Sequence, residues 1–155
     1  MINKKVEVRD SEINGKGLFA KEKILKDEPI WWNTNDIKIY RIENISSLPK
    51  EQRDEVYKIA YRVNPTTVIC DTSIAKFMNH SCNANCWSAN DGTPMDIARR
   101  DIEIDTEITT DYGVIQCVVW HTPFDCSCGD PNCRGTITEN DINLPEIKSK
   151  YKNRM

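Results

Sequence analysis

Residues 77–85 read Phe-Met-Asn-His-Ser-Cys-Asn-Ala-Asn, and this stretch carries much of the information about the fold. Three further stretches follow or precede it in a fixed order along the chain. They are Gly15-Lys16-Gly17-Leu18-Phe19-Ala20, Ala98-Arg99-Arg100-Asp101-Ile102 and Glu107-Ile108-Thr109-Thr110-Asp111-Tyr112-Gly113. A lone Gly-x-Gly turn occurs in many unrelated proteins, whereas four stretches in this order and spacing form a specific signature.

The apolar pattern around these stretches predicts short strands joined by turns. One helix is predicted at about residues 48–63, because apolar residues from Val56 to Val63 recur at helical spacing and Asn64-Pro65 ends the pattern. Many short strands without alternating βαβ units indicate a mostly β domain, of the β-rich α+β class. Strands are expected at Lys5–Arg9, Ile24–Trp32, Ile37–Ile45, Thr67–Cys70, Asp96–Arg99, Glu107–Thr110 and Ile115–Trp120.

The chain has 155 residues, of which 39% are hydrophobic and 29% are charged, so it is long enough to form one domain with its own core. No apolar run approaches the roughly 18 residues of a membrane-spanning helix. No hydrophobic segment follows the basic N-terminal residues, so no secretory signal is visible. We therefore expect an intracellular protein without a membrane partner.

The net charge of −3 argues against direct binding of nucleic acid, which normally requires a basic surface. Seven acidic residues lie between Asp91 and Asp111, against Arg99 and Arg100. This acidic stretch is either solvated surface or the border of a site for a basic peptide. The last eight residues carry four basic side chains, and we expect them to form a frayed, solvated terminus.

Seven cysteines are many for an intracellular domain, and three of them lie close together at Cys126, Cys128 and Cys133. In a reducing compartment this spacing favours a metal site over disulfides. Zinc in a structural site takes four ligands in a tetrahedron, and thiolates suit it. A catalytic zinc is not expected, because four thiolates leave no open position. The fourth ligand would come from one of the remaining cysteines, Cys70, Cys82, Cys86 or Cys117.

The four stretches together resemble those of SET-domain protein-lysine methyltransferases, and the cysteine-rich segment resembles the post-SET knuckle of that family. The resemblance covers about residues 6–137. It implies several small sheets with one short insert helix, and a C-terminal segment threaded near residues 79–82. It also implies a SET domain over residues 1–122, a post-SET knuckle over 123–138 and a C-terminal tail over 139–155, with Cys82 as the fourth zinc ligand.

The resemblance further implies S-adenosylmethionine as cofactor and one structural zinc. A glycine turn lets the backbone approach a ligand closely, and in this family that turn contacts the cofactor. Asn79 and His80 resemble the pair that binds its amino group and adenine. Taken alone, an Asn-His pair is more often a loop whose hydrogen bonds are satisfied internally. The expected cofactor-binding residues are therefore Gly15, Lys16, Gly17, Leu18, Asn79 and His80.

By the same resemblance Tyr112 is the expected catalytic residue; otherwise it is a core tyrosine at the end of a strand. Thr110 and Val68 occupy positions that correspond to the lysine channel. Since Thr110 is smaller than the aromatic residue that is common there, the channel should be wide enough for di- or trimethylation. The sequence departs from the family pattern at Ala84, where proline is usual, and at Asp27 and Asp105, where turn glycines are common.

The implied function is transfer of a methyl group to a lysine ε-amine of a protein or peptide, with a histone tail as the commonest substrate. That would place the protein in the nucleus, and a different substrate would place it in the cytoplasm. Two alternatives remain open, namely a SET-like peptide-binding module with weak activity and a zinc-knuckle interaction protein. The sequence does not indicate an oligomeric state.

Overall fold

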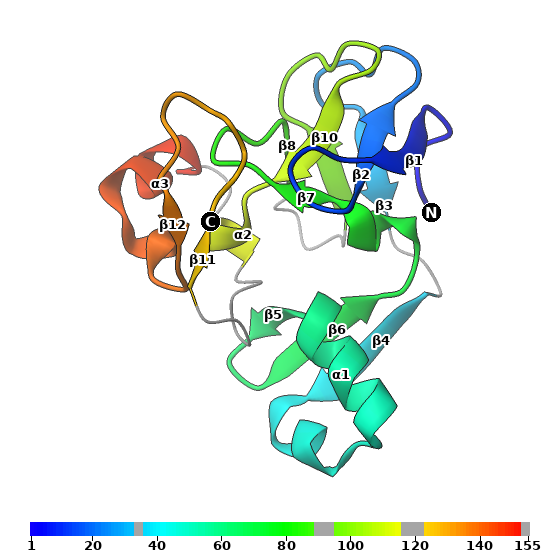
Figure 1. Ribbon diagram of the computed structural model, residues 1–155, viewed down its shortest axis with the longest axis vertical. Coiled ribbons are helices and arrows are strands. Elements are labelled where there is room, and N and C mark those ends of the chain that lie inside the picture. The colour runs from blue at the N-terminus through cyan, green and yellow to red at the C-terminus, as the bar shows by residue number, and fades with distance from the viewer. Residues whose placement is uncertain (33–35, 89–94, 116–122, 153–155) are drawn as a thin grey trace.

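The computed structural model describes residues 1–32, 36–88, 95–115 and 123–152 (Figure 1). The helical segments are α1 (Lys50–Ile59), α2 (Tyr112–Ile115) and α3 (Pro145–Lys150), with 3-10 turns η1 (Ile42–Ser47), η2 (Ile74–Phe77) and η4 (Asp141–Asn143). The strands are β1 (Val6–Asp10), β2 (Lys16–Ala20), β3 (Pro29–Trp32), β4 (Ile37–Arg41), β5 (Tyr61–Asn64), β6 (Thr67–Asp71), β7 (Asn79–His80), β8 (Cys86–Ser88), β9 (Met95–Ala98), β10 (Glu107–Thr110), β11 (Phe124–Asp125) and β12 (Thr136–Ile137). The predicted class, mostly β with small sheets, is confirmed.

The largest sheet has the strand order β1-β2-β10-β7 and brings the sequence stretches together. β10 runs antiparallel to β2, with Ile108 opposite Leu18. On its other side β10 runs parallel to β7, with Thr109 opposite Asn79 and Thr110 opposite His80. The glycine turn, the Asn-His pair and the segment before Tyr112 therefore lie side by side, although about 60 residues separate the first two in the chain.

A second sheet, of order β3-β9-β8, shares one hydrophobic core with the largest sheet. Branched aliphatic side chains from both sheets fill this core and exclude water, which is the main stabilising contribution to such a small domain. Its completely buried members include Leu18, Ile24, Ile30 and Ile108.

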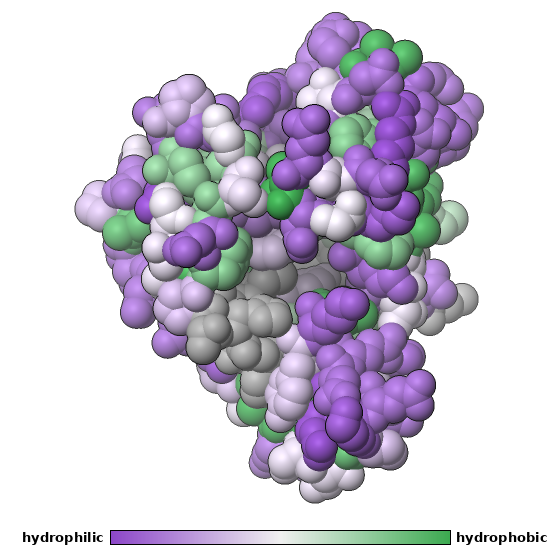
Figure 2. All heavy atoms as spheres, in the orientation of Figure 1, coloured by the Kyte–Doolittle hydropathy of each residue, from purple (hydrophilic) through white to green (hydrophobic). Residues whose placement is uncertain are grey.

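The third sheet, of order β4-β6-β5, forms a separate lobe with α1 and η1 (Figure 1). We call residues 37–71 the insert. The insert has its own small core, where Ile45, Val56 and Val68 are almost completely buried. The opposite face of α1 is charged, and the surface over this helix is strongly hydrophilic (Figure 2).

The insert helix is shorter than the sequence predicts. α1 ends at Ile59, because Ala60 takes an extended conformation and residues 61–64 pair with β6 instead of continuing the helix. The predicted strand 37–45 likewise ends at Arg41 and continues as η1, and the predicted strand 24–32 begins only at Pro29. Of the expected strand 115–120, Ile115 ends α2 and the other residues lie outside the described ranges.

The two turn aspartates adopt the backbone conformation that glycine usually supplies. Asp27 and Asp105 both have φ of 65°, and no other non-glycine residue described has a positive φ. Asp tolerates the left-handed region better than most residues. The departure from glycine at these positions is therefore compatible with the fold.

The C-terminal segment is folded rather than frayed as far as residue 151. Ile147 on α3 and Tyr151 directly after it are 2% and 1% exposed. Lys150 is half-buried, and its Nζ donates a hydrogen bond to the carbonyl oxygen of Cys82 over 2.6 Å. The expectation of a solvated terminus fails because the side chains of Ile147 and Tyr151 are buried against the rest of the protein. Within the described residues, no helix is long and apolar enough to span a membrane.

Candidate active site

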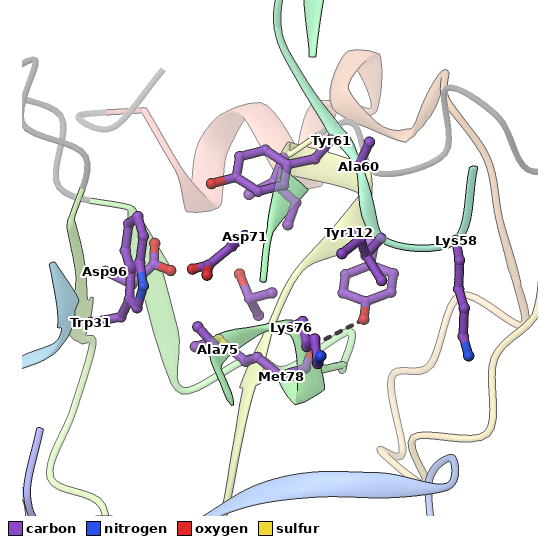
Figure 3. A pocket seen from close by; sticks show the side chains of 13 residues that line it. Trp31, Lys58, Ala60, Tyr61, Asp71, Ala75, Lys76, Met78, Asp96 and Tyr112 are labelled. Carbon is purple, nitrogen blue, oxygen red and sulfur yellow. Dashed lines mark hydrogen bonds between the residues drawn. The ribbon is translucent and has the colours of Figure 1, made fainter. Parts of the chain in front are cut away.

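A cavity of about 120 Å³ lies between the insert and the two sheets of the main body (Figure 3). Thr110 and Tyr112 contribute to its wall from the end of β10 and the start of α2, and Met78 contributes from the segment before β7. The insert contributes residues from the end of α1, from β5 and from the end of β6. The remaining wall residues are Trp31, Lys58, Ile59, Ala60, Tyr61, Asp71, Ala75, Lys76, Asp96 and Ile115.

Hydrogen bonds to Met78 and His80 hold Tyr112 in this wall. Its hydroxyl donates to the carbonyl oxygen of Met78 over 2.9 Å (Figure 3), and its backbone N–H donates to Nδ1 of His80 over 3.1 Å. The rings of His80 and Phe124 lie 5.5 and 6.2 Å from the ring of Tyr112, measured between centroids. The tyrosine begins α2 instead of ending a strand, so its side chain leaves the sheet and reaches the cavity.

His80 is almost completely buried, and its protonation state follows from its neighbours. Burial lowers the pKa of His80 to about 4, although the nearby Asp111 carboxylate acts in the opposite direction. The ring is therefore neutral at pH 7. Since Nδ1 accepts from the N–H of Tyr112, the ring proton is on Nε2, which lies 3.4 Å from Sγ of Cys82.

Asn79 fixes the glycine turn at the sheet edge. Its Nδ2 lies within 3.1 Å of the carbonyl oxygens of Asn14 and Lys16, and 2.8 Å from Oε1 of Glu107. The predicted residues 15, 16, 17 and 79 are thus brought together, with the Asn79 side chain bonded to the turn itself. Gly15 has a φ of +50° and open space where a Cβ would be.

Gly17 lies against the carboxylate end of the Glu107 side chain. A Cβ at this position would force Oε1 of Glu107 to move, and this oxygen also accepts a hydrogen bond from the hydroxyl of Ser11. Sequence reasoning missed Glu107 as part of this arrangement. Its place two residues after the turn at Asp105 is not a signal by itself, because only the pairing of β10 with β2 brings it to Gly17.

Two predicted site residues lie elsewhere. The side chain of Leu18 is completely buried in the main core. Val68 is completely buried in the core of the insert and does not belong to the cavity wall. The reason for the position of Val68 is its pairing with Tyr40 and Arg62 in the middle of the insert sheet.

Four cysteines gather at the junction of the main body and the C-terminal segment. The Sγ atoms of Cys82, Cys126, Cys128 and Cys133 all lie within 4.8 Å of one another. Sγ of Cys82 is 3.9 Å from those of Cys126 and Cys133. Tetrahedral zinc with Zn–S bonds of about 2.3 Å places its sulfurs about 3.8 Å apart, so the cluster fits this metal. Cys70 and Cys86 are buried elsewhere, and Cys117 lies outside the described residues.

A buried ion pair next to the cluster was not apparent from the sequence. Both carboxylate oxygens of Asp111 accept hydrogen bonds from the guanidinium of Arg134, over 2.9 and 2.6 Å. Asp111 is 1% exposed and also lies 3.3 Å from the hydroxyl of Tyr151. Burial lowers the pKa of Arg134, but hydrogen bonding to Asp111 acts against burial, and the net result is a pKa above its ordinary value. This network attaches the C-terminal segment to the residue that precedes Tyr112.

Phe124 is a further site residue that sequence reasoning missed. Its ring lies 5.9 Å from that of His80, in an edge-to-face arrangement. The only local signal is an aromatic residue two positions before Cys126. Its relevance depends on the cysteine cluster, which brings β11 next to Tyr112.

Comparison with known proteins finds relatives that align with most of this chain. The chain is 31% identical over 149 residues to the human histone-lysine N-methyltransferase SETD1B and to the Caenorhabditis elegans histone-lysine N-methyltransferase set-2. Each alignment covers 86% of this chain, but the chain spans only 7% and 9% of the length of these relatives.

Solved structures share the fold. The methyltransferase domain of human histone-lysine N-methyltransferase SETMAR matches with a TM-score of 0.65 and 19% identity, covering 88% of this chain and 59% of that one. KRYPTONITE in complex with mCHG DNA and SAH matches with a TM-score of 0.61 and 20% identity, covering 86% and 29%. The family model of the SET domain matches residues 15–113. The chain therefore belongs to the SET domain family.

Proposed function

We propose that this protein is an S-adenosylmethionine-dependent protein-lysine N-methyltransferase. The observation that carries the proposal is the placement of the Tyr112 hydroxyl on the carbonyl oxygen of Met78 in the cavity wall, directly beside Thr110 and His80. Membership of the SET domain family and the methyltransferase names of the relatives support it. The alternatives of a weakly active binding module or a zinc-knuckle interaction protein have no comparable observation in their favour.

The cofactor supplies the methyl group when it is bound. The turn at Gly15 and Gly17, fixed by Asn79, would offer backbone groups to such a ligand, with open space beside Gly15. The SAH in the KRYPTONITE structure supports the choice of cofactor. Leu18 would contribute indirectly, because its buried side chain anchors the strand that follows the turn. His80 lies next to Asn79 on β7, and its backbone would contact the cofactor. Lys16, whose side chain is exposed, would contribute through its backbone.

The cavity would prepare the substrate amine. An ordinary lysine has a pKa near 10.4 and is protonated at pH 7, so its nitrogen has no lone pair for attack. Apolar walls from Ala60, Met78 and Ile115 would favour the neutral amine. The oxygen atoms of Tyr112 and Met78 would accept hydrogen bonds from the amine and direct its lone pair to the methyl group. Such positioning removes several kcal/mol from the barrier.

The four-cysteine cluster would hold one structural zinc. Thiolate ligands at Cys82, Cys126, Cys128 and Cys133 close the coordination sphere, so the metal would organise the chain and not take part in the transfer. By joining Cys82 to the knuckle, it would keep Phe124 against Tyr112 and His80.

A histone tail is the proposed substrate, which would place the protein at chromatin. The names of the relatives and the acidic residues at the cavity support this assignment. The experiment is incubation of the purified protein with S-adenosylmethionine, core histones and an array of histone peptides, followed by mass spectrometry. We expect a mass increase of one or more methyl groups at a lysine. The absence of methylated lysine on every histone and peptide would contradict the substrate class.

A further inference from the structure

One side of the cavity carries polar atoms that the lysine methyltransferase function does not use. Asp71 ends β6 in the insert and is 5% exposed, and Trp31 lies on β3 in the main body and is 3% exposed. Both line the cavity. Oδ2 of Asp71 and Nε1 of Trp31 have no hydrogen-bond partner among the described residues. Figure 3 shows the carboxylate and the indole nitrogen facing the cavity, on the side away from Tyr112.

The structural role of Asp71 accounts for only one of its two oxygens. Oδ1 accepts a hydrogen bond from the backbone N–H of Ser73 over 2.8 Å and so fixes the turn before η2. Oδ2 is left without a donor, and no cationic side chain of the described part of the chain pairs with this carboxylate. A buried, unsatisfied carboxylate oxygen is costly unless a donor from outside the protein reaches it.

A second carboxylate lies on the same wall. Asp96 on β9 is directly opposite Trp31 in the β3–β9 pairing, so the two side chains share one face of the sheet. Asp96 also belongs to the acidic stretch that precedes Tyr112. The main body and the insert each contribute one carboxylate to this side, whereas Lys58 lies on the side of Tyr112 and Lys76 is held over the ring of Phe77 (Figure 3).

We propose that Asp71 and Asp96 form a subsite for an arginine side chain that flanks the target lysine in the protein substrate. The proposal rests on the lysine methyltransferase function proposed above. A guanidinium offers planar pairs of N–H donors that suit carboxylates and bridge two of them, which an ammonium group does less well. The N–H of Trp31 is directed to a carbonyl oxygen of the same peptide. The subsite selects substrates in which an arginine lies close to the lysine in sequence.

The test compares matched peptides in a binding assay that needs no turnover. Fluorescent lysine peptides carry one arginine at each flanking position in turn, or citrulline, its neutral isostere, at the same position. Affinity is measured by fluorescence anisotropy in the presence of S-adenosylhomocysteine at constant ionic strength. At one or more positions we expect the arginine peptide to bind at least about tenfold more tightly than the citrulline peptide.

Two variants locate the effect. Asp71→Asn keeps an oxygen for Ser73 but removes the charge, and it should reduce the arginine-to-citrulline ratio to within about twofold of one. Asp54→Asn, on the exposed face of α1, removes the same charge outside the cavity and should retain the wild-type ratio. If circular dichroism shows that Asp71→Asn is unfolded, the ratio is measured on Asp96→Asn instead.

If the wild type binds the arginine and citrulline peptides with equal affinity at every position, the subsite is overturned, because the two carboxylates then do not recognise a guanidinium. An arginine preference that survives in the folded Asp71 and Asp96 variants would also overturn it. The two proposals fail separately. Arginine-selective binding without methyl transfer to the same peptides would reject the enzymatic function alone, and methyl transfer at equal rates to both peptides would reject the subsite alone.

Discussion

The backbone N–H of Tyr112 donates a hydrogen bond to Nδ1 of His80 over 3.1 Å. This bond joins the start of α2 to the strand that carries the Asn-His pair, and it fixes the tautomer of a buried, neutral histidine. The other ring nitrogen is thereby directed at Sγ of Cys82. The imidazole of His80 thus connects the candidate catalytic residue with the cysteine cluster. We therefore expect a change in the cluster to alter the position of Tyr112.

Loss of one thiolate should therefore affect both metal content and activity. We expect Cys82→Ser to lose most of its bound zinc, because structural zinc sites contribute roughly 10 kcal/mol or more and depend on all ligands. Methyl transfer should fall with the metal while the β-rich core stays folded. Elemental analysis of the purified protein gives the metal content, and circular dichroism reports the fold.

Cys86→Ser is the matched control, because Cys86 is completely buried in the main core and lies outside the cluster. It should retain one equivalent of zinc. Stoichiometric zinc in Cys82→Ser together with its loss in Cys86→Ser would show that the fourth ligand has been wrongly assigned.

The ion pair between Asp111 and Arg134 should contribute strongly to stability. Arg134→Met leaves the Asp111 carboxylate buried without its partner, and breaking one side of a buried pair costs about 3–5 kcal/mol. We expect the free energy of unfolding, measured with urea at saturating zinc, to fall by that order. Asp54→Asn breaks an exposed ion pair with Lys50 and should cost about 1 kcal/mol or less. If Arg134→Met and Asp54→Asn both lower the free energy of unfolding by about 1 kcal/mol or less, the buried pair between Asp111 and Arg134 is not formed.

The contact between Gly17 and Glu107 should control cofactor affinity. In Gly17→Ala the new Cβ displaces the Glu107 carboxylate and weakens its hydrogen bonds to Ser11 and Asn79. We expect the affinity for S-adenosylhomocysteine, measured by titration calorimetry, to fall about tenfold or more. Glu12→Ala, an exposed change in the same loop, should leave it unchanged. If Gly17→Ala and Glu12→Ala bind S-adenosylhomocysteine with equal affinity, the contact between Gly17 and Glu107 does not control cofactor binding.

Part of the arrangement was predictable from the sequence. The resemblance of the four motif stretches to one family indicated which residues belong to one site, and the local cysteine spacing pointed to three of the four clustered thiols. Asp27 and Asp105 take the left-handed conformation expected of residues at glycine positions.

Other features depend on packing between distant segments, which local patterns do not encode. The apolar spacing through Val63 is helical, yet pairing with β6 draws residues 61–64 into a sheet. Pairing within the insert likewise buries Val68 away from the cavity. The partnership of Asp111 with Arg134 and the convergence of Asp71 with Trp31 arise only when the lobes and the C-terminal segment come together.

The product of the reaction should depend on the size of residue 110. Thr110 lines the cavity next to Tyr112, and its small side chain leaves room for a methylated amine to rotate. We expect wild-type protein with excess cofactor to form di- or trimethyllysine, and Thr110→Tyr to shift the product towards monomethyllysine, as read by mass spectrometry. A wild type that stops at one methyl group, with no change in Thr110→Tyr, would remove Thr110 from the channel.

The most direct measurement is the comparison of wild type with Tyr112→Phe in methyl transfer from S-adenosylmethionine and in binding of S-adenosylhomocysteine. Removing the hydroxyl abolishes its contact with Met78 and its hold on the amine, while the turn and Asn79 remain in place. We predict a loss of turnover of about 100-fold or more with cofactor affinity within about twofold of wild type. Full turnover in Tyr112→Phe, or no methyl transfer by the wild type to any lysine substrate, would contradict the account.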